Sequence, residues 1–137
     1  MSMADFNTQV ITEFRDNAGH VGGMFEGMPL LLLHHVGAKS GAARIAPLAY
    51  REDEGRYAIF ASKGGAPENP AWYHNVMAHP DTRIELGGQT IEVVATEAEG
   101  EERDRIFAAQ AAASPQFGEY QEKTDRTIPV VLLTPKG

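Results

Sequence analysis

A short stretch near the middle of the chain combines several chemically distinct groups: Ser62 and Lys63, two glycines, two prolines and a pair of aromatic residues. A strand is expected to end at Ser62, and Asn69 before Pro70 predicts a helix that begins at the proline, with Asn69 as its cap. The N-terminus of a helix presents unpaired N–H groups and the positive end of the helix dipole. A hydroxyl, an ammonium group and backbone donors would then converge, which suits an anion or a carbonyl-rich ring edge. The alternative is an exposed loop with an ordinary helix cap.

A second cationic loop, GAKSGAAR, also follows an expected strand and carries Lys39, Ser40 and Arg44. It is not a P-loop, because the order and spacing of Gly, Lys and Ser differ. Taken alone, this loop is best interpreted as a surface turn with solvated charges. Two such loops at the ends of neighbouring strands, in a chain whose net charge is -7, indicate a specific anionic ligand.

The aromatic pair that follows has to be divided between two environments. Trp72 and Tyr73 are consecutive on the expected helix, so their side chains point about 100° apart. We expect Trp72 to pack with Val76 in the core. Tyr73 is expected at the margin of that core, where it can face a pocket.

The histidines do not form a pattern that would bind a metal. His34 and His35 are adjacent in an expected strand, so their side chains diverge to opposite faces. His74 and His79 are separated by an expected helix end, and the sequence contains neither H-E-x-x-H nor G-x-S-x-G. Neither a metal site nor serine hydrolysis is therefore expected.

The composition is that of an ordinary globular chain, with 42% hydrophobic and 23% charged residues in 137. The absence of cysteine excludes disulfides, thiolate metal sites and a cysteine nucleophile. The net negative charge disfavours general nucleic-acid binding, which relies on Lys and Arg against phosphate. The longest aliphatic run, Leu30 to Leu33, is far shorter than a membrane span, and no signal peptide is visible. We therefore expect a cytoplasmic protein with no integral membrane segment.

Periodicity and turn residues predict one domain built mainly from strands. The N-terminal helix is expected over 4–18, and a glycine-rich loop follows it through residue 28. Thr96 and Glu99 have capping-box spacing and predict a helix that ends near residue 113. The other expected elements are strands at 30–36, 44–50, 56–61, 82–86, 89–95 and 128–134, a helix at 69–78, and a short helix or ordered loop at 116–125.

The expected fold class is mainly β with peripheral helices (α+β). The six strands come in hairpins with little strict alternation of strand and helix, so a doubly wound sheet is not expected. A small closed or split antiparallel barrel removes the exposed strand edges that an open sheet of this size would leave. We expect residues 1–28 to form the N-terminal helix and loop, and residues 29–137 to form the barrel that binds the ligand.

Four segments keep, in order, the motifs of a known family: GAKSGAARIAPLAY, ASKGGAPENPAWYHN, the pair His79 and Pro80, and TDRTIPVVLLTP. In these segments the chain resembles the deazaflavin-dependent nitroreductase family, small reductases that use coenzyme F-420. The resemblance covers roughly residues 29–135, nearly the whole chain. It implies a six-stranded split β-barrel like that of FMN-binding reductases, which agrees with the strand count above.

The resemblance also implies a cofactor and the residues that bind it. Coenzyme F-420 carries a phosphate and an oligoglutamate tail, and Lys39, Ser40 and Arg44 would bind these anions. Tyr120 and Ser62 are the implied catalytic residues, Tyr120 near the substrate and Ser62 against the deazaflavin ring. The other implied cofactor contacts are Ile45, Ala46, Pro47, Leu48, Phe60, Ala61, Lys63, Ala71, Trp72, Tyr73, His74 and Asn75.

The implied reaction is hydride transfer from reduced F-420 to a small electron-poor acceptor: a quinone, an activated enone or lactone, or a nitroaromatic. Some family members carry tyrosine where this chain has Phe117, and phenylalanine cannot donate a proton. Tyr120, Ser62 or a water molecule is left as the proton source. Two alternatives stay open: an FMN-dependent reductase on the same barrel, and an F-420-binding carrier without turnover. A homodimer is the expected oligomeric state, because split barrels often pair.

Overall fold

A computed structural model describes residues 3–19, 21–22 and 29–136. Most of the expected glycine-rich loop, residues 20 and 23–28, lies outside the described residues. The helices are α1 (Met3–Asp16), α2 (Ala71–Ala78), α3 (Gly100–Ala113) and α4 (Gln116–Glu122), with a 3₁₀ turn, η2 (Lys63–Gly65). The strands are β1 (Leu30–Val36), β2 (Ala43–Asp53), β3 (Arg56–Phe60), β4 (Asp81–Leu86), β5 (Gln89–Glu97) and β6 (Val130–Pro135).

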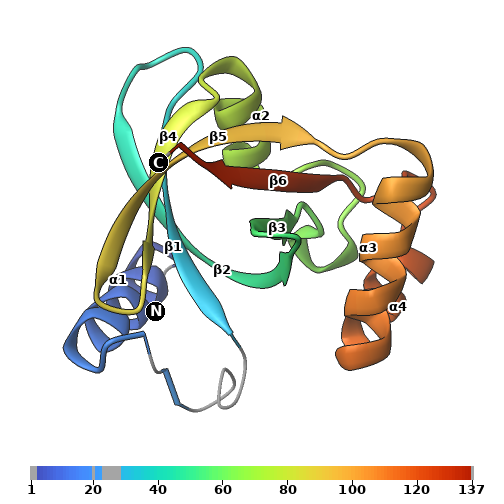
Figure 1. Ribbon diagram of the computed structural model, residues 1–137, viewed down its shortest axis with the longest axis horizontal. Helices are drawn as coiled ribbons and strands as arrows, with labels where there is room; N and C mark the ends of the chain where they lie inside the picture. Colours follow the sequence, from blue (N-terminus) through green and yellow to red (C-terminus); the bar gives the residue numbers. More distant parts are fainter. Residues whose placement is uncertain (1–2, 20, 23–28, 137) are drawn as a thin grey trace.

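The six strands form a closed antiparallel barrel in the order β1-β2-β3-β6-β5-β4 (Figure 1). The meander β1-β2-β3 and the hairpin β4-β5 are joined by β6, which pairs with β3 and with β5. The barrel closes where β4 pairs with β1 through Leu32 and Leu33. Each strand thus has two neighbours, which removes the free edges of an open sheet. The expected class, a six-stranded antiparallel barrel with peripheral helices, is confirmed.

The barrel interior is filled by alternate residues of the strands and by one face of α2. Leu31 and Leu33 of β1 share a fully buried cluster with Ile59 of β3 and Val76 of α2. Trp72 belongs to the same cluster and is only 6% exposed, as expected for a tryptophan in the core stripe. α2 contacts both β1 and β5, so the helix after the 61–75 stretch is fixed against the barrel.

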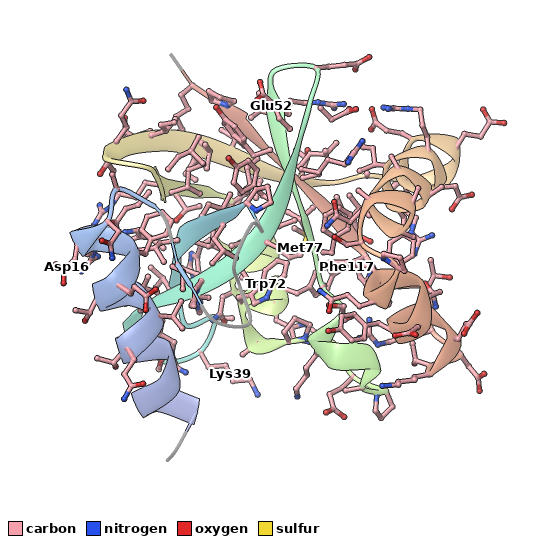
Figure 2. All side chains as sticks on the ribbon, turned by 90° about the horizontal axis from the view of Figure 1, so that it is seen from below. Asp16, Lys39, Glu52, Trp72, Met77 and Phe117 are labelled. Atoms are coloured by element: carbon pink, nitrogen blue, oxygen red, sulfur yellow. The ribbon has the colours of Figure 1, made fainter. Side chains whose placement is uncertain are left out.

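Helices cover two opposite outer faces of the barrel (Figures 1 and 2). On one side, Val10 and Phe14 of α1 pack against Leu30 and Leu32 of β1. On the other side, α3 and α4 pack against the outer faces of β3 and β6, in a cluster that includes Phe117. Among the described helices, none has both the length and the apolar character that crossing a bilayer requires.

The expected capping box is wrong. Thr96 stays in β5, where it pairs with Leu132 of β6, and the helix begins only at Gly100. Glu99 is the N-cap, and no side-chain hydrogen bond caps the helix. The ladder with β6 satisfies the backbone of Thr96, so the strand continues beyond the point where local sequence predicts a helix start.

Candidate functional site

A cavity of about 600 Å³ lies between the loop after β1 and the first turns of α2. It contains six of the residues predicted to bind the cofactor, from segments more than 25 positions apart in the sequence. The lining residues are Gly37, Ala38, Lys39, Ser40, Arg44, Ala71, His74 and Asn75. The predicted cationic loop and the predicted helix start therefore meet at one site.

Lys39 and Arg44 have exposed side chains and make no ion pair with any described residue. By contrast, Arg56 and Arg105 are both paired with acidic side chains. The net charge of the chain is -7, and these two unpaired cations form a locally positive site beside the cavity. Guanidinium and ammonium groups bind phosphate and carboxylate oxygens well, so this cavity suits an anionic ligand.

Hydrogen bonds within the loop 37–42 hold its shape. The Gly37 N–H donates to the carbonyl of Ala42 (2.9 Å), and the Gly41 N–H donates to the carbonyl of Gly37 (2.9 Å). The Ser40 hydroxyl accepts a hydrogen bond from the Ala42 N–H at 3.2 Å. Gly41 has φ +71, a conformation that favours glycine. The loop is therefore a closed turn that presents Lys39 outward, as Figure 2 shows.

Lys63 does not line this cavity. The chain turns sharply after β3, with Lys63 itself at φ 47, and the Lys63 Nζ forms an exposed ion pair with Glu68 at 2.9 Å. The expectation that Lys63 and the start of α2 form one anion site is not met within the described residues. A cofactor contact of Lys63 stays a prediction.

Arg126 braces the segment between β3 and α2, a role that the sequence reading missed. Its guanidinium donates to the carbonyl oxygens of Ser62 (3.0 Å) and Ala66 (3.0 Å). It also donates to Oδ1 of Asn69 at 2.7 Å. The predicted Asn69 cap is wrong for this reason: Pro70 is the N-cap of α2, without a side-chain bond. The only sequence signal for Arg126 is its place in the TDRTIP motif.

Gly65 is required where η2 meets α4. Its φ is +86, and a Cβ there would lie 2.8 Å from the carbonyl oxygen of Tyr120. We expect Gly65→Ala to lower the free energy of unfolding by about 2–4 kcal/mol, from backbone strain together with the clash. The matched control is Gly55→Ala, which has φ +81 but nothing within 4 Å. Denaturant titration of both variants tests this, and equal losses would show that the contact with α4 contributes nothing.

Ser62 and Tyr120, the two predicted catalytic residues, lie on neighbouring elements, since η2 packs against α4. Ser62 lies two residues after the end of β3 and is 9% exposed. Tyr120 is half-buried, and no described residue hydrogen-bonds its hydroxyl. Phe117 is buried between Phe60 (ring centroids 5.4 Å apart) and Tyr120 (5.6 Å). Tyr120 is therefore the phenol available on α4, whereas Phe117 fills the core.

Phe60 and Ala61 are buried on opposite faces of the barrel wall, Phe60 under α3 and α4 and Ala61 in the interior. The predicted contacts on β2 divide in the same way. Ala46 and Leu48 pack against the interior cluster, whereas Ile45 packs against the α1 side. Strand alternation prevents Ile45, Ala46, Pro47 and Leu48 from all lining one approach to a ring.

Tyr73 also points away from the cavity. Its hydroxyl donates to the Glu97 carboxylate of β5. Burial, together with this carboxylate, raises the pKa of Tyr73 to about 12. Trp72 is held in the barrel core. Of the predicted contacts on α2, the structure thus places Ala71, His74 and Asn75 at the cavity and leaves both aromatic residues outside it.

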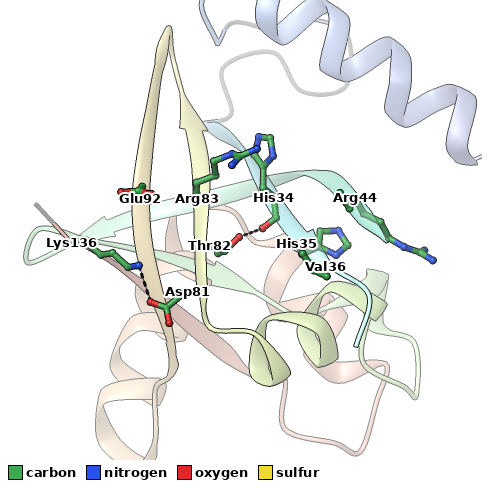
Figure 3. Close-up of a pocket in the computed structure, with 10 residues that line it drawn as sticks. His34, His35, Val36, Arg44, Asp81, Thr82, Arg83, Glu92 and Lys136 are labelled. Atoms are coloured by element: carbon green, nitrogen blue, oxygen red, sulfur yellow. Dashed lines mark hydrogen bonds and ion pairs between the residues drawn. The ribbon is translucent and has the colours of Figure 1, made fainter. Parts of the chain in front are cut away.

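A second, smaller cavity of about 360 Å³ adjoins the first through Arg44, which lines both (Figure 3). Its other lining residues are His34, His35, Val36, Ala43, Asp81, Thr82, Arg83, Glu92 and Lys136. As expected, the two adjacent histidines face opposite sides. His34 pairs with Glu85 (2.7 Å), and His35 bonds to Asn75 (2.9 Å). His35 was not predicted as a site residue, because an isolated histidine in a strand carries no motif.

Burial lowers the pKa of His35 to about 4, and the positive charge of Arg44 adds to this shift. An unfolded chain would bind a proton on this histidine near pH 6.5, whereas the folded chain does not. Acidification from pH 6.5 to pH 4 is therefore expected to destabilise the fold, by about 3 kcal/mol at most, with no further loss below pH 4 from this group. We expect His35→Asn to flatten this part of the pH profile in urea titrations, whereas His79→Asn, at an exposed position, should not. A parent profile that His35→Asn leaves unchanged would contradict the assignment.

The fold is an antiparallel six-stranded barrel, and two unpaired cations lie at a cavity beside the start of α2. These two features define the class: a split-barrel protein suited to an anionic cofactor. Residues 7–135 match the model of the family described as F420H(2)-dependent quinone reductase, and the chain belongs to that family. The expected class, split-barrel reductases that use F-420, is confirmed, under a description that specifies quinone rather than nitro reduction. Membership makes the protein an F-420-dependent oxidoreductase, and coenzyme F-420 is the cofactor of the family.

Individual relatives agree with the family assignment. An F420H(2)-dependent quinone reductase of Mycobacterium tuberculosis is 38% identical over 125 residues, which span 88% of this chain and 84% of that protein. The solved structure of an F420-H2 dependent reductase, FDR-A, is 44% identical with a TM-score of 0.70, and the match covers 77% of this chain and 93% of that one. A solved domain-swapped dimer is 40% identical with a TM-score of 0.72, over 96% of this chain and 99% of that one.

Proposed function

We propose that this protein is an F-420-dependent quinone reductase in which Lys39 of the loop 37–42 and Arg44 of β2 bind the anionic part of the cofactor. The cavity between this loop and α2 carries the proposal, because it presents two unpaired cations in a chain that is otherwise acidic. A phosphate or a carboxylate fits these donors, so the residues present suit the phosphate and the glutamate tail of F-420. The names of the relatives supply the acceptor class.

Five of the eight residues that line the cavity have a proposed task. Lys39 and Arg44 neutralise the cofactor anions, and the Arg44 guanidinium can hold two oxygens of one group. Ser40 contributes its hydroxyl beside them. Ala71 leaves room at the start of α2, where backbone N–H groups lack helical partners. His74 completes the wall of the cavity.

When bound, reduced F-420 supplies a hydride, and a quinone requires one proton in addition to become a hydroquinone. We propose that the Tyr120 hydroxyl provides that proton, because no described residue engages it. Ser62 and the Arg126-braced turn hold the ring end of the cofactor. Only a short segment of chain separates Ser62 from α2, which begins at Ala71 and lines the cavity that holds Lys39. The proposed ring end of the cofactor site is therefore connected to the proposed anion end.

Single-turnover kinetics test the acceptor and the role of Tyr120. Protein loaded with reduced F-420 is mixed with a quinone, an activated enone or a nitroaromatic, and cofactor oxidation is followed by absorbance. We expect the quinone to accelerate oxidation most, and Tyr120→Phe to slow it by roughly a hundredfold or more without changing cofactor affinity. If no acceptor accelerates oxidation, the non-catalytic carrier is favoured.

The FMN-dependent alternative receives no support from the family, although FMN also carries a phosphate that the Lys39 loop could bind. Enones, lactones and nitroaromatics stay secondary candidates as acceptors. A cytoplasmic location likewise stays a prediction. The acceptor screen decides among the substrates, and a competition titration decides between the cofactors.

We also propose that the protein forms a homodimer, supported by the related chain that was solved as a domain-swapped dimer. Light scattering after size exclusion should give twice the mass of the chain.

We further propose that residues 29–137 are the deazaflavin-binding unit and that α1 covers one face of it. The ion pair of Arg15 with Glu85 (2.7 Å) supports this role, because it ties α1 to β4.

A further inference from the structure

His35 is a buried histidine close to the loop 37–42, which is called the cofactor loop below. It follows Leu31 and Leu33 on the inward face of β1, and its residual exposure is 7%. The loop 37–42 begins two residues later. The proposed chemistry assigns no role to His35, yet a buried imidazole requires a defined hydrogen-bond partner.

The side chain of Asn75 joins His35 to this loop. Asn75 lies on the buried face of α2 and is 7% exposed. Its Oδ1 accepts a hydrogen bond from the Ala38 N–H at 2.9 Å. Its Nδ2 lies 2.9 Å from Nδ1 of His35. Strand, helix and loop are thus connected through one carboxamide.

The chemistry of the donors fixes the state of the histidine. A backbone N–H can only donate, so Oδ1 of Asn75 must face Ala38 and Nδ2 must face His35. The Nδ2 group can only donate, so the Nδ1 of His35 must accept and carries no proton. The imidazole is therefore neutral, with its proton on Nε2.

We propose that His35 is a positioning residue for the cofactor loop: its Nδ1 orients Asn75, and Asn75 fixes Ala38 and with it Lys39. This inference rests on the proposed function of that loop. Without the acceptor on His35, the Asn75 amide loses one of its two anchors and can rotate. Ala38 then loses its tie to α2, and the ammonium group of Lys39 is no longer held beside the cavity.

The charges around His35 agree with a ring that carries no charge at neutral pH. Arg44 lies opposite His35 in the β1–β2 ladder. A second positive charge on His35 would be unfavourable next to it. The other ionisable groups that line the same cavity as His35 are His34 on β1, Asp81 and Arg83 on β4, Glu92 on β5 and Lys136 after β6, and His74 of α2 lines the adjoining cavity. His35 thus acts as a fixed acceptor at neutral pH.

Two substitutions separate this role from simple filling of space. In His35→Asn, the Oδ1 stands as far from Cβ as the Nδ1 that it replaces, so an acceptor is retained. His35→Leu keeps a bulky side chain but has no acceptor. We expect F-420 affinity within about threefold of the parent for His35→Asn and about tenfold weaker for His35→Leu, since a buried amide donor is left unpaired. His79→Asn and His79→Leu, at the exposed C-cap of α2, are the matched controls and should bind like the parent.

The decisive readouts do not require the cofactor. Nitrogen NMR of the free protein should show His35 with the proton on Nε2, and the Ala38 amide should exchange slowly in the parent and in His35→Asn but fast in His35→Leu. A proton on Nδ1, or slow Ala38 exchange in His35→Leu, would overturn the inference, as would parent-like F-420 binding by His35→Leu. Failure of the parent to bind F-420 would instead refute the proposed function, and the NMR and exchange results would still decide whether His35 positions the loop.

Discussion

Removing both cations of the cavity, in Lys39→Ala/Arg44→Ala, is expected to weaken F-420 binding by roughly two to three orders of magnitude. Each charge-assisted contact to a phosphate or carboxylate contributes on the order of 1.5–3 kcal/mol, which corresponds to about tenfold to a hundredfold for each single variant. The two groups line one cavity and bind one ligand, so their effects are not expected to add fully.

A charge-matched control distinguishes local contacts from the overall field. Arg56→Ala/Arg105→Ala also removes two positive charges, one from β3 and one from α3, and both of these arginines pair with Asp53 of β2. Fluorescence titration with F-420 should show parent affinity for this control, apart from a small loss that rising salt removes. If both double variants weaken binding equally, the loop contributes only net charge and has no specific contact with the cofactor.

Arg126→Ala is expected to produce a large loss of stability at the site. Its guanidinium bonds three oxygens of the segment between Ser62 and Asn69, and it is half-buried. Loss of these charge-assisted bonds should lower the free energy of unfolding by about 3 kcal/mol. Arg126→Lys should recover little, because one ammonium group cannot match three acceptors in a fork geometry.

The measurement for Arg126 combines stability with binding. Urea titration gives the free energy of unfolding, and F-420 titration is performed where each variant is folded. We expect Arg126→Ala to weaken binding as well, because the turn at Ser62 loses its brace. Arg105→Ala, which removes an exposed arginine paired with Asp53, is the control and should change the free energy of unfolding little, because water screens an exposed ion pair. A loss of similar size in both variants would show that the bonds of Arg126 contribute no more than a surface ion pair.

The elements of the fold were predictable because their signals are local. The run Leu30–Val36 matches β1 at both ends, and the turn at Gly87 and Gly88 places β4 and β5 correctly. The capping box at Thr96 failed because pairing with β6 outweighs a local helix signal. β2 runs to Asp53, beyond the expected end, because its hairpin with β3 pairs Asp53 with Arg56.

The site was only partly predictable, because contacts between distant segments leave no local pattern. Lys39, Arg44 and the start of α2 were identified from their types and from their places beside strand ends, and they share a cavity. Lys63 was grouped with them, but its partner is Glu68, which depends on how the chain turns after β3. Arg126 and His35 were missed because their partners lie in other elements, at distances in sequence that no motif encodes.

Competitive equilibrium titration of the cofactor-free protein with F-420 and FMN tests the central claim most directly, namely that this barrel is built to hold F-420. We predict that F-420 displaces FMN at comparable concentrations and that added salt weakens F-420 binding, because Lys39 and Arg44 contact its anions. An FMN affinity equal to that for F-420 would contradict the account. An F-420 affinity that does not change with salt concentration would contradict it as well.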